Sequence, residues 1–326
     1  MSTKLSTQLP SINQLPQSYI IKLNHWGAIS LSGAEQSSYL QGQVTCDVNT
    51  LTDSNILLGA HCNAKGKVFA CFRLVNHLGE HLLLQPKSTI DASLTELKKF
   101  GVFAKVEINQ AEQLSLYAIA GNHAEKVMLE IFDKLPTSSS PVSHEKQITA
   151  IYINGSTPRY MLIGEEEPLT SLISQLQQPI VNEQVWDLLE INQGIPKLSA
   201  PAIAQYVPQM LNMQAINGIS FTKGCYLGQE TVARMQYLGK NKKALFSLTG
   251  QLTASINELI IERQLGENWR KAGDVLCSYS ADNNEIFIQA VLPNDIDNET
   301  PLRLQGQDSA TLSLVELPYS LSSESE

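Results

Sequence analysis

The sequence has few aromatic residues, and no apolar run in it is long enough to cross a bilayer. Aromatic residues make up 6% of the 326 residues and include only three tryptophans, so indole side chains are rare in this chain. Residues 1–17 lack a basic region followed by an apolar block, which argues against a secretory signal. We therefore expect no membrane association and a cytoplasmic location.

Cysteine is also scarce, and its spacing excludes several kinds of site. The sequence has five cysteines, at Cys46, Cys62, Cys71, Cys225 and Cys277. Without an export signal, an odd number of widely spaced cysteines is typical of free thiols in a reducing cytosol. No CxxC or Cys/His spacing indicates a built-in zinc or iron–sulfur site, and His77 and His81 fall at a turn between two strand-like runs rather than on one helix. We therefore expect no resident metal.

Basic residues are fewer than acidic ones, and the formal net charge is −9. This is the wrong sign for a protein that wraps nucleic acid in general. One local exception is a basic stretch formed by Arg234, Lys240, Lys242 and Lys243. It is either a solvated linker face or a contact site for RNA or an acidic partner, and the sequence leaves both open.

The chain is long enough for two or three compact units. Helix-like and strand-like patterns alternate up to residue 240, whereas residues 241–326 contain short β-rich runs. We predict a hairpin from residues 56–62 and 67–75, and helices over residues 89–99, 169–177 and 183–192. A capping box at Ser32 and Glu35 should begin a helix that ends near Leu40, and Gly101 should be a left-handed C-cap.

One octapeptide, Lys-Gly-Cys-Tyr-Leu-Gly-Gln-Glu at residues 223–230, concentrates chemical features. It follows the short apolar run 218–221 and precedes a helical pattern, so we predict a strand, a tight loop and a helix. Gly224 and Gly228 permit backbone angles that other residues avoid. Cys225 would then lie near a helix start and beside Lys223, and both features favour a reactive thiolate. A buried cysteine in a glycine-rich turn is the alternative, and the residues alone leave it open.

The octapeptide resembles the K-G-C-Y-x-G-Q-E signature of the YgfZ family, folate-binding proteins of tRNA modification and iron–sulfur maintenance that are related to the glycine-cleavage T protein. All seven fixed positions match: Lys223, Gly224, Cys225, Tyr226, Gly228, Gln229 and Glu230. Residues 40–48 resemble the family's L-Q-G-Q-x-T-x-D-V segment, and residues 190–196 resemble its E-x-x-x-G-I-P segment. The resemblance implies an α+β, T-protein-like folate-binding fold of two interleaved subdomains over residues 1–240, followed by a C-terminal β-barrel over residues 241–326.

The same resemblance implies a folate ligand, a tetrahydrofolate derivative. Trp26 and Trp186 match tryptophans associated with folate in the family, whereas Trp269 does not. Glu190 lies one helical turn from Trp186 on the same face and could accept hydrogen bonds from the pterin amino group. The alternatives are ordinary core tryptophans and a charge on the helix surface.

Three functions remain after this comparison. A folate-dependent aminomethyl transferase would carry an acidic pair after a glycine-rich turn, but Ala70 and Cys71 occupy the matching positions, so a carboxylate that would handle protons is missing. A tRNA-binding module would use the basic stretch, against the sign of the net charge. We therefore predict an accessory protein rather than an enzyme, with Cys225 as its reactive group. Its partners would be folate and iron–sulfur enzymes, including the radical enzymes that thiolate tRNA.

Overall fold

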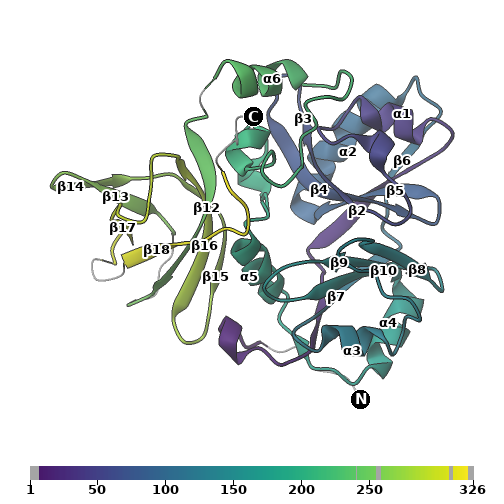
Figure 1. Cartoon of the computed structure of the whole chain (residues 1–326), viewed down its shortest axis with the longest axis horizontal. Helices are drawn as coiled ribbons and strands as arrows, with labels where there is room; N and C mark the ends of the chain where they lie inside the picture. Colours follow the sequence, from purple (N-terminus) through teal and green to yellow (C-terminus); the bar gives the residue numbers. More distant parts are fainter. Residues whose placement is uncertain (1–6, 240, 255–257, 308–310, 322–326) are drawn as a thin grey trace.

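The computed structural model describes residues 7–239, 241–254, 258–307 and 311–321. They form an α+β structure built on three sheets, two in the first part of the chain and one in the last (Figure 1). The boundary predicted after residue 240 stays a prediction, and Lys240 itself lies outside the described residues. Within the described residues, no helix has both the length and the apolar character needed to span a membrane.

The first sheet has six strands. In spatial order they are β11 (Ile180–Val181), β1 (Tyr19–Lys22), β7 (Leu114–Ala120), β10 (Arg159–Glu165), β9 (Ile148–Ile153) and β8 (Val142–Glu145). β1 is antiparallel to β7 and parallel to β11. Tyr19 and Arg159 both pair with Ala120 of β7, so these two polar side chains flank one position of the sheet.

The second sheet has five strands. In spatial order they are β3 (Leu57–Cys62), β4 (Val68–His77), β5 (Glu80–Pro86), β2 (Trp26–Ser32) and β6 (Glu107–Gln110). The predicted hairpin is confirmed as β3 and β4, and Leu78 and Gly79 adopt positive φ angles in the turn that joins β4 to β5. Since β1 belongs to the first sheet, β2–β6 to the second and β7–β11 to the first again, the two subdomains are interleaved as expected.

The third sheet has seven antiparallel strands, and the first of them along the chain begins at Lys243, the last residue of the basic stretch. In spatial order they are β14 (Asn268–Lys271), β13 (Ile261–Leu265), β17 (Leu302–Leu304), β18 (Thr311–Val315), β12 (Lys243–Gln251), β16 (Glu285–Pro293) and β15 (Asp274–Ser280). The sheet is strongly bent and forms the body on one side of the molecule (Figure 1). This confirms a β-barrel as the C-terminal architecture.

The helices cover the sheets and join them. They are α1 (Gln36–Gln41), α2 (Lys87–Gly101), α3 (Ala124–Met128), α4 (Glu166–Gln175), α5 (Gln184–Gln193) and α6 (Gln229–Tyr237), with short 3-10 turns at Ile12–Gln14, Val48–Thr50, Ala200–Ala202 and Pro208–Leu211. α2 packs on the second sheet, α3 and α4 pack on the first, and α5 packs against β15 and β16 of the barrel. Gly194, with φ 62°, ends α5 in a left-handed C-cap.

A central core joins the three sheets around α5. It contains Tyr19 from the first sheet, Trp26 from the second, Trp186 from α5 and Tyr279 from the barrel. All four side chains are almost fully buried. Residues far apart in the sequence are thus held at one place, and the candidate site lies beside this core.

Two local predictions were wrong. Ser32 remains in β2 and Glu35, although it is the N-cap of α1, makes no side-chain cap, because its carboxylate accepts the backbone N–H of Lys105 instead. Gly101 continues α2, and the C-cap is Val102 in right-handed geometry. At Glu35 a tertiary hydrogen bond to Lys105 replaces the predicted cap, and the helix continues through Gly101 instead of ending before it.

Candidate functional site

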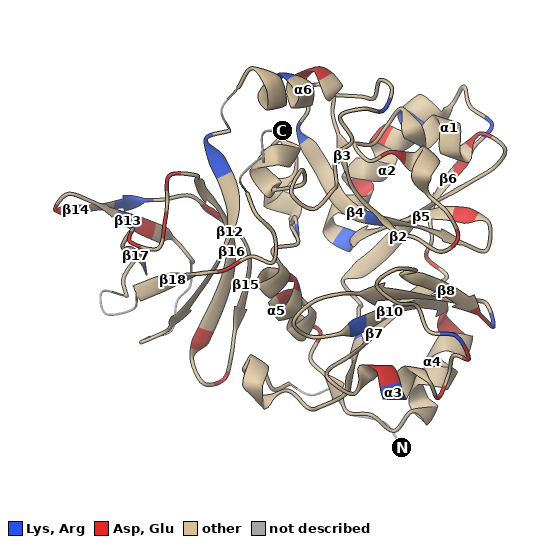
Figure 2. Cartoon of the chain, viewed as in Figure 1, with Lys and Arg blue, Asp and Glu red and all other residues tan. Residues whose placement is uncertain are grey.

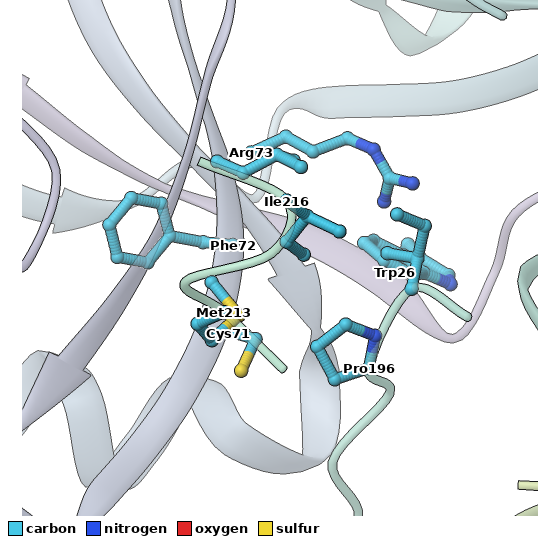
Figure 3. Close-up of a pocket in the computed structure, with 9 residues that line it drawn as sticks. Trp26, Cys71, Phe72, Arg73, Pro196, Met213 and Ile216 are labelled. Atoms are coloured by element: carbon cyan, nitrogen blue, oxygen red, sulfur yellow. The ribbon is translucent and has the colours of Figure 1, made fainter. Parts of the chain in front are cut away.

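A small cavity lies between the second sheet, the chain after α5 and the loop before the octapeptide. Its lining residues are Trp26, Leu58, Cys71, Phe72, Arg73, Ile195, Pro196, Met213 and Ile216. The cavity volume is about 10 Å³, which leaves room for roughly one water molecule. Figure 3 shows Arg73 extending above Trp26, with Cys71 beside Met213.

The two matched tryptophans lie in contact. Their ring centroids are 6.1 Å apart and the planes are inclined by 82°, an edge-to-face arrangement. Trp26 begins β2 and lines the cavity, whereas Trp186 of α5 is fully buried behind it. Within the described structure neither indole N–H has an acceptor. Trp26 therefore forms one part of the cavity wall, and Trp186 packs behind it.

Glu190 is buried, and its carboxylate is paired with two arginines. Arg73 Nη2 lies 2.8 Å from each carboxylate oxygen, and Arg159 Nη2 donates to Oε1 at 2.5 Å. Each of the three side chains is at most 4% exposed. The alternative of a helix-surface charge for Glu190 is therefore wrong.

The cluster carries more positive than negative charge. Two guanidinium groups face one carboxylate, and burial lowers the pKa of Arg159 to about 10, so that it stays protonated at neutral pH. Arg73 lies 5.4 Å from the Trp26 ring and Arg159 lies 4.7 Å from the Trp186 ring, so both guanidinium groups also contact indoles. The Tyr19 hydroxyl and Arg159 Nε have no partner in the described structure. The site thus offers unpaired donors and a net positive charge.

Sequence reasoning missed both arginines. Arg73 stands inside the apolar run Val-Phe-Ala-Cys-Phe-Arg-Leu-Val of β4, and Arg159 begins the apolar run of β10. A charged residue inside a strand buried on both faces must find a partner. The sequence therefore indicates that each arginine has a buried partner, although it does not identify that partner.

Cys71, the second residue at the position of the acidic pair, lines the cavity, and Ala70 is fully buried. Burial raises the pKa of the Cys71 thiol well above its usual range, so the thiol stays protonated. No carboxylate is present among the described residues that line the cavity.

The octapeptide packs against two other parts of the chain. Leu227 N–H donates to the Gly42 carbonyl at 3.0 Å, and Ser220, three residues before the octapeptide, donates its N–H to the Thr45 carbonyl at 2.9 Å. Gly228 has φ 84°, and a Cβ there would lie 2.5 Å from the Asn63 carbonyl in the β3–β4 turn. Only glycine fits this approach. The octapeptide, the 40–48 segment and the β3–β4 turn therefore form one unit.

The Lys223 ammonium binds backbone carbonyls of the 40–48 segment. Its Nζ donates to the carbonyls of Val44 at 2.9 Å and Cys46 at 2.7 Å, and burial lowers its pKa to about 8. α6 begins at Gln229, four residues after Cys225, so the thiol lies farther from the helix start than predicted. Lys223 is an anchor that fastens the octapeptide to the 40–48 segment.

The other signature residues range from buried to exposed, with Gln229 half-buried. Tyr226 is buried, and its N–H donates to Gln229 Oε1 at 3.3 Å. Gly224, Cys225 and Glu230 are exposed. The alternative of a buried cysteine in a glycine-rich turn is therefore wrong, since the thiol is on the surface.

We expect Cys225 to be alkylated at least about tenfold faster than any other cysteine of the folded protein. Cys225 is exposed, and the remaining cysteines are buried or half-buried. Burial raises the pKa of the Cys46 and Cys277 thiols to about 12 and that of Cys62 still further. Limited iodoacetamide labelling followed by peptide mapping measures the order. Fastest labelling at Cys277 would contradict it.

The basic stretch is only partly described. Arg234 and Lys242 are exposed, Lys243 is half-buried and Lys240 lies outside the described residues. Figure 2 shows basic residue positions on α6 and at the start of β12, together with acidic positions on α6. A direct RNA contact here stays a prediction.

Comparisons with known proteins agree with this arrangement. The family model described as YgfZ, beta-barrel domain, matches residues 241–308. The tRNA-modifying protein YgfZ of Colwellia psychrerythraea is 54% identical over 99% of this chain and 100% of its own. The protein of the same name from Vibrio vulnificus (strain CMCP6) is 41% identical over 97% of each chain.

A solved structure shows the same fold. The glycine cleavage system aminomethyltransferase T from Bartonella henselae matches with a TM-score of 0.71, over 93% of this chain and 86% of that chain. Sequence identity is 12%, so the likeness concerns the fold. It confirms the expected T-protein-like architecture.

Proposed function

Because the chain belongs to the YgfZ family, we propose that it is a cytoplasmic folate-binding accessory protein that serves tRNA modification by supporting iron–sulfur enzymes. The observation that best supports a folate ligand is the cavity in which Trp26 lies beside the Arg73 guanidinium. The curated relatives named tRNA-modifying protein support the cellular role.

The chemistry of the cavity suits a reduced folate. A folate has a flat pterin with acceptor and donor atoms, an aromatic aminobenzoyl group and an anionic glutamate tail. The Trp26 indole offers an apolar wall and an N–H without an acceptor in the described structure. Buried polar groups are nearly always hydrogen-bonded, so this N–H favours a ligand that brings an acceptor. The net positive charge of the arginine cluster favours an electron-rich or anionic ligand.

Glu190 fits as a group that orients the pterin. Its Oε1 accepts from both arginines, whereas its Oε2 accepts from Arg73 alone. A carboxylate oxygen accepts two hydrogen bonds, so Oε2 retains capacity for the pterin amino group. The arginines fix the orientation of the carboxylate, and Glu190 acts in the proposal as an orienting acceptor.

The cavity supports binding rather than group transfer. The transferase alternative needs a base near the folate nitrogen, and the group at that wall is the protonated thiol of Cys71. We therefore propose that folate is a bound ligand and that Cys225 carries the chemistry toward partners. Those partners are iron–sulfur enzymes, including radical enzymes that thiolate tRNA. Direct binding of tRNA through Arg234 and Lys242 is less supported, because the net charge of the protein is −9.

The test is a titration of the purified protein with 5-formyltetrahydrofolate, followed by tryptophan fluorescence. Binding should quench the emission, because the ring lies against Trp26. Trp26→Ala should weaken affinity by about 5- to 150-fold, since stacking a flat ring on an aromatic side chain is worth about 1–3 kcal/mol. Trp186→Phe should have a smaller effect, because Trp186 lies behind the wall.

Trp269→Ala is the matched control, since this indole lies in the barrel beneath Arg303. It should leave the affinity unchanged. If Trp26→Ala binds folate as tightly as the unmodified protein, the ligand site lies elsewhere.

A further inference from the structure

The cavity is too small for the ligand that its chemistry suits. Its volume is about 10 Å³, whereas small-molecule pockets usually measure about 300–1,000 Å³. One wall must therefore move when a ring enters.

Most of the wall is fixed by hydrogen bonds. Trp26, Cys71 and Arg73 belong to β2 and β4, which lie inside the five-stranded sheet. The chain after α5 is also held, because Gln289 of the barrel donates to the Ile195 carbonyl at 2.9 Å and accepts the Lys197 N–H at 2.9 Å. Neither the two strands nor the chain after α5 can move without breaking hydrogen bonds of the sheet or of the barrel.

The remaining wall is residues 213–217, the wall segment, which contributes Met213 and Ile216 to the cavity. In the described structure its backbone hydrogen bonds end within residues 208–218, for example Ala215 N–H to the Asn212 carbonyl at 2.9 Å. The segment is therefore fastened to itself rather than to a sheet. Its packing against the cavity is apolar, so it is the part that a ring can displace.

The two ends of the wall segment are attached to different bodies. Before it, Asn212 exchanges hydrogen bonds with the backbone of Leu245 in β12, at 2.8 and 3.1 Å. After it, the Gly218 carbonyl accepts the Thr45 hydroxyl at 2.6 Å, and Ser220 N–H donates to the Thr45 carbonyl at 2.9 Å. The first end is thus tied to the barrel, and the second end is tied to Thr45.

Thr45 stands between the two carbonyls that bind Lys223, those of Val44 and Cys46. The Lys223 N–H also donates to Ser220 Oγ at 3.2 Å. Ile216 and Phe221 pack in the same apolar cluster, and Phe221 contacts the Tyr237 ring of α6 edge-on at 6.4 Å. Residues 218–222, which join the wall segment to the octapeptide, therefore contact Thr45, Lys223 and α6.

We propose that the wall segment couples the folate cavity to the octapeptide, so that entry of the pterin ring displaces Met213 and Ile216 and changes the exposure of Cys225. This rests on the proposed folate binding. The empty and filled cavity would then present two arrangements of the thiol to a partner, and folate would act as a signal as well as a ligand.

The test measures the alkylation rate of Cys225 by iodoacetamide with and without saturating 5-formyltetrahydrofolate. We expect the rate to change by at least about threefold. Tetrahydropterin, which has the ring but no aminobenzoylglutamate tail, should also change the rate, because the ring displaces the wall. A change with the folate and none with saturating tetrahydropterin would mean that the tail shields the thiol directly, and would overturn the proposal.

The variant Met213→Ala separates folate binding from the coupling to Cys225. It enlarges the cavity, so folate should bind at least as tightly by fluorescence while its effect on Cys225 labelling shrinks. If folate quenches the fluorescence of the unmodified protein and leaves the Cys225 rate unchanged, the coupling is wrong and folate binding stands. A coupling of full size in Met213→Ala would also overturn it. If folate binds nowhere, the proposed function fails and the coupling with it.

Discussion

Glu190→Gln is expected to lower the free energy of unfolding by about 3–5 kcal/mol. The substitution keeps the shape of the side chain and removes its charge, which leaves Arg73 and Arg159 buried without a counter-ion. Two cations would then face each other in a region that excludes water, and the folded state bears that cost. Urea unfolding followed by circular dichroism measures it.

Glu166→Gln is the matched control. This glutamate pairs with Lys22 at 3.6 Å, but its side chain is 63% exposed, so the loss should be about 0–1 kcal/mol. An equally small loss in Glu190→Gln would mean that the cluster does not depend on this carboxylate for its charge balance, and the account of the site would need another anion.

Cys225→Ser is expected to abolish support of tRNA thiolation in cells while leaving folate affinity unchanged. The thiol is exposed and does not line the cavity, which explains why binding should persist. Serine has a similar shape and lacks the nucleophilic sulfur, so a chemical role of the thiol would be lost. Thiolated nucleosides measured in tRNA from cells that carry only the variant should fall to the level of cells without the protein.

The control is Cys277→Ser, at a half-buried thiol of the barrel, which should keep tRNA thiolation. Normal thiolation in Cys225→Ser cells would show that the octapeptide acts through its shape alone. Lost folate binding in the same variant would place Cys225 within the ligand site. Either outcome contradicts the separation of the two roles.

The general architecture was accessible from the sequence because it depends on local patterns. The apolar run of β4 and the turn at residues 63–66 gave the hairpin, and the periodic residues of α5 gave the helix that carries Trp186. Strands β14 and β18 offer no comparable signal, since both contain polar residues and lack a continuous apolar run. The capping box failed because Lys105 took the Glu35 carboxylate.

Only part of the site could be predicted from the sequence. Resemblance pointed to Trp26, Trp186 and Glu190, and the structure places all three around the buried charge cluster. The partners of Glu190 lie 117 and 31 residues away, on different sheets, so no local pattern joins them. The same limit applies to Lys223, whose ammonium reaches carbonyls 177 and 179 residues away and not the neighbouring thiol.

The most direct measurement is a crystal structure of the complex with 5-formyltetrahydrofolate. We expect the pterin ring to lie against Trp26 and Arg73, with its amino group at Glu190 Oε2. Met213 and Ile216 should be displaced, and Cys225 should lie on a separate surface. A folate bound anywhere else, with the cavity still closed over Trp26, would contradict this expectation.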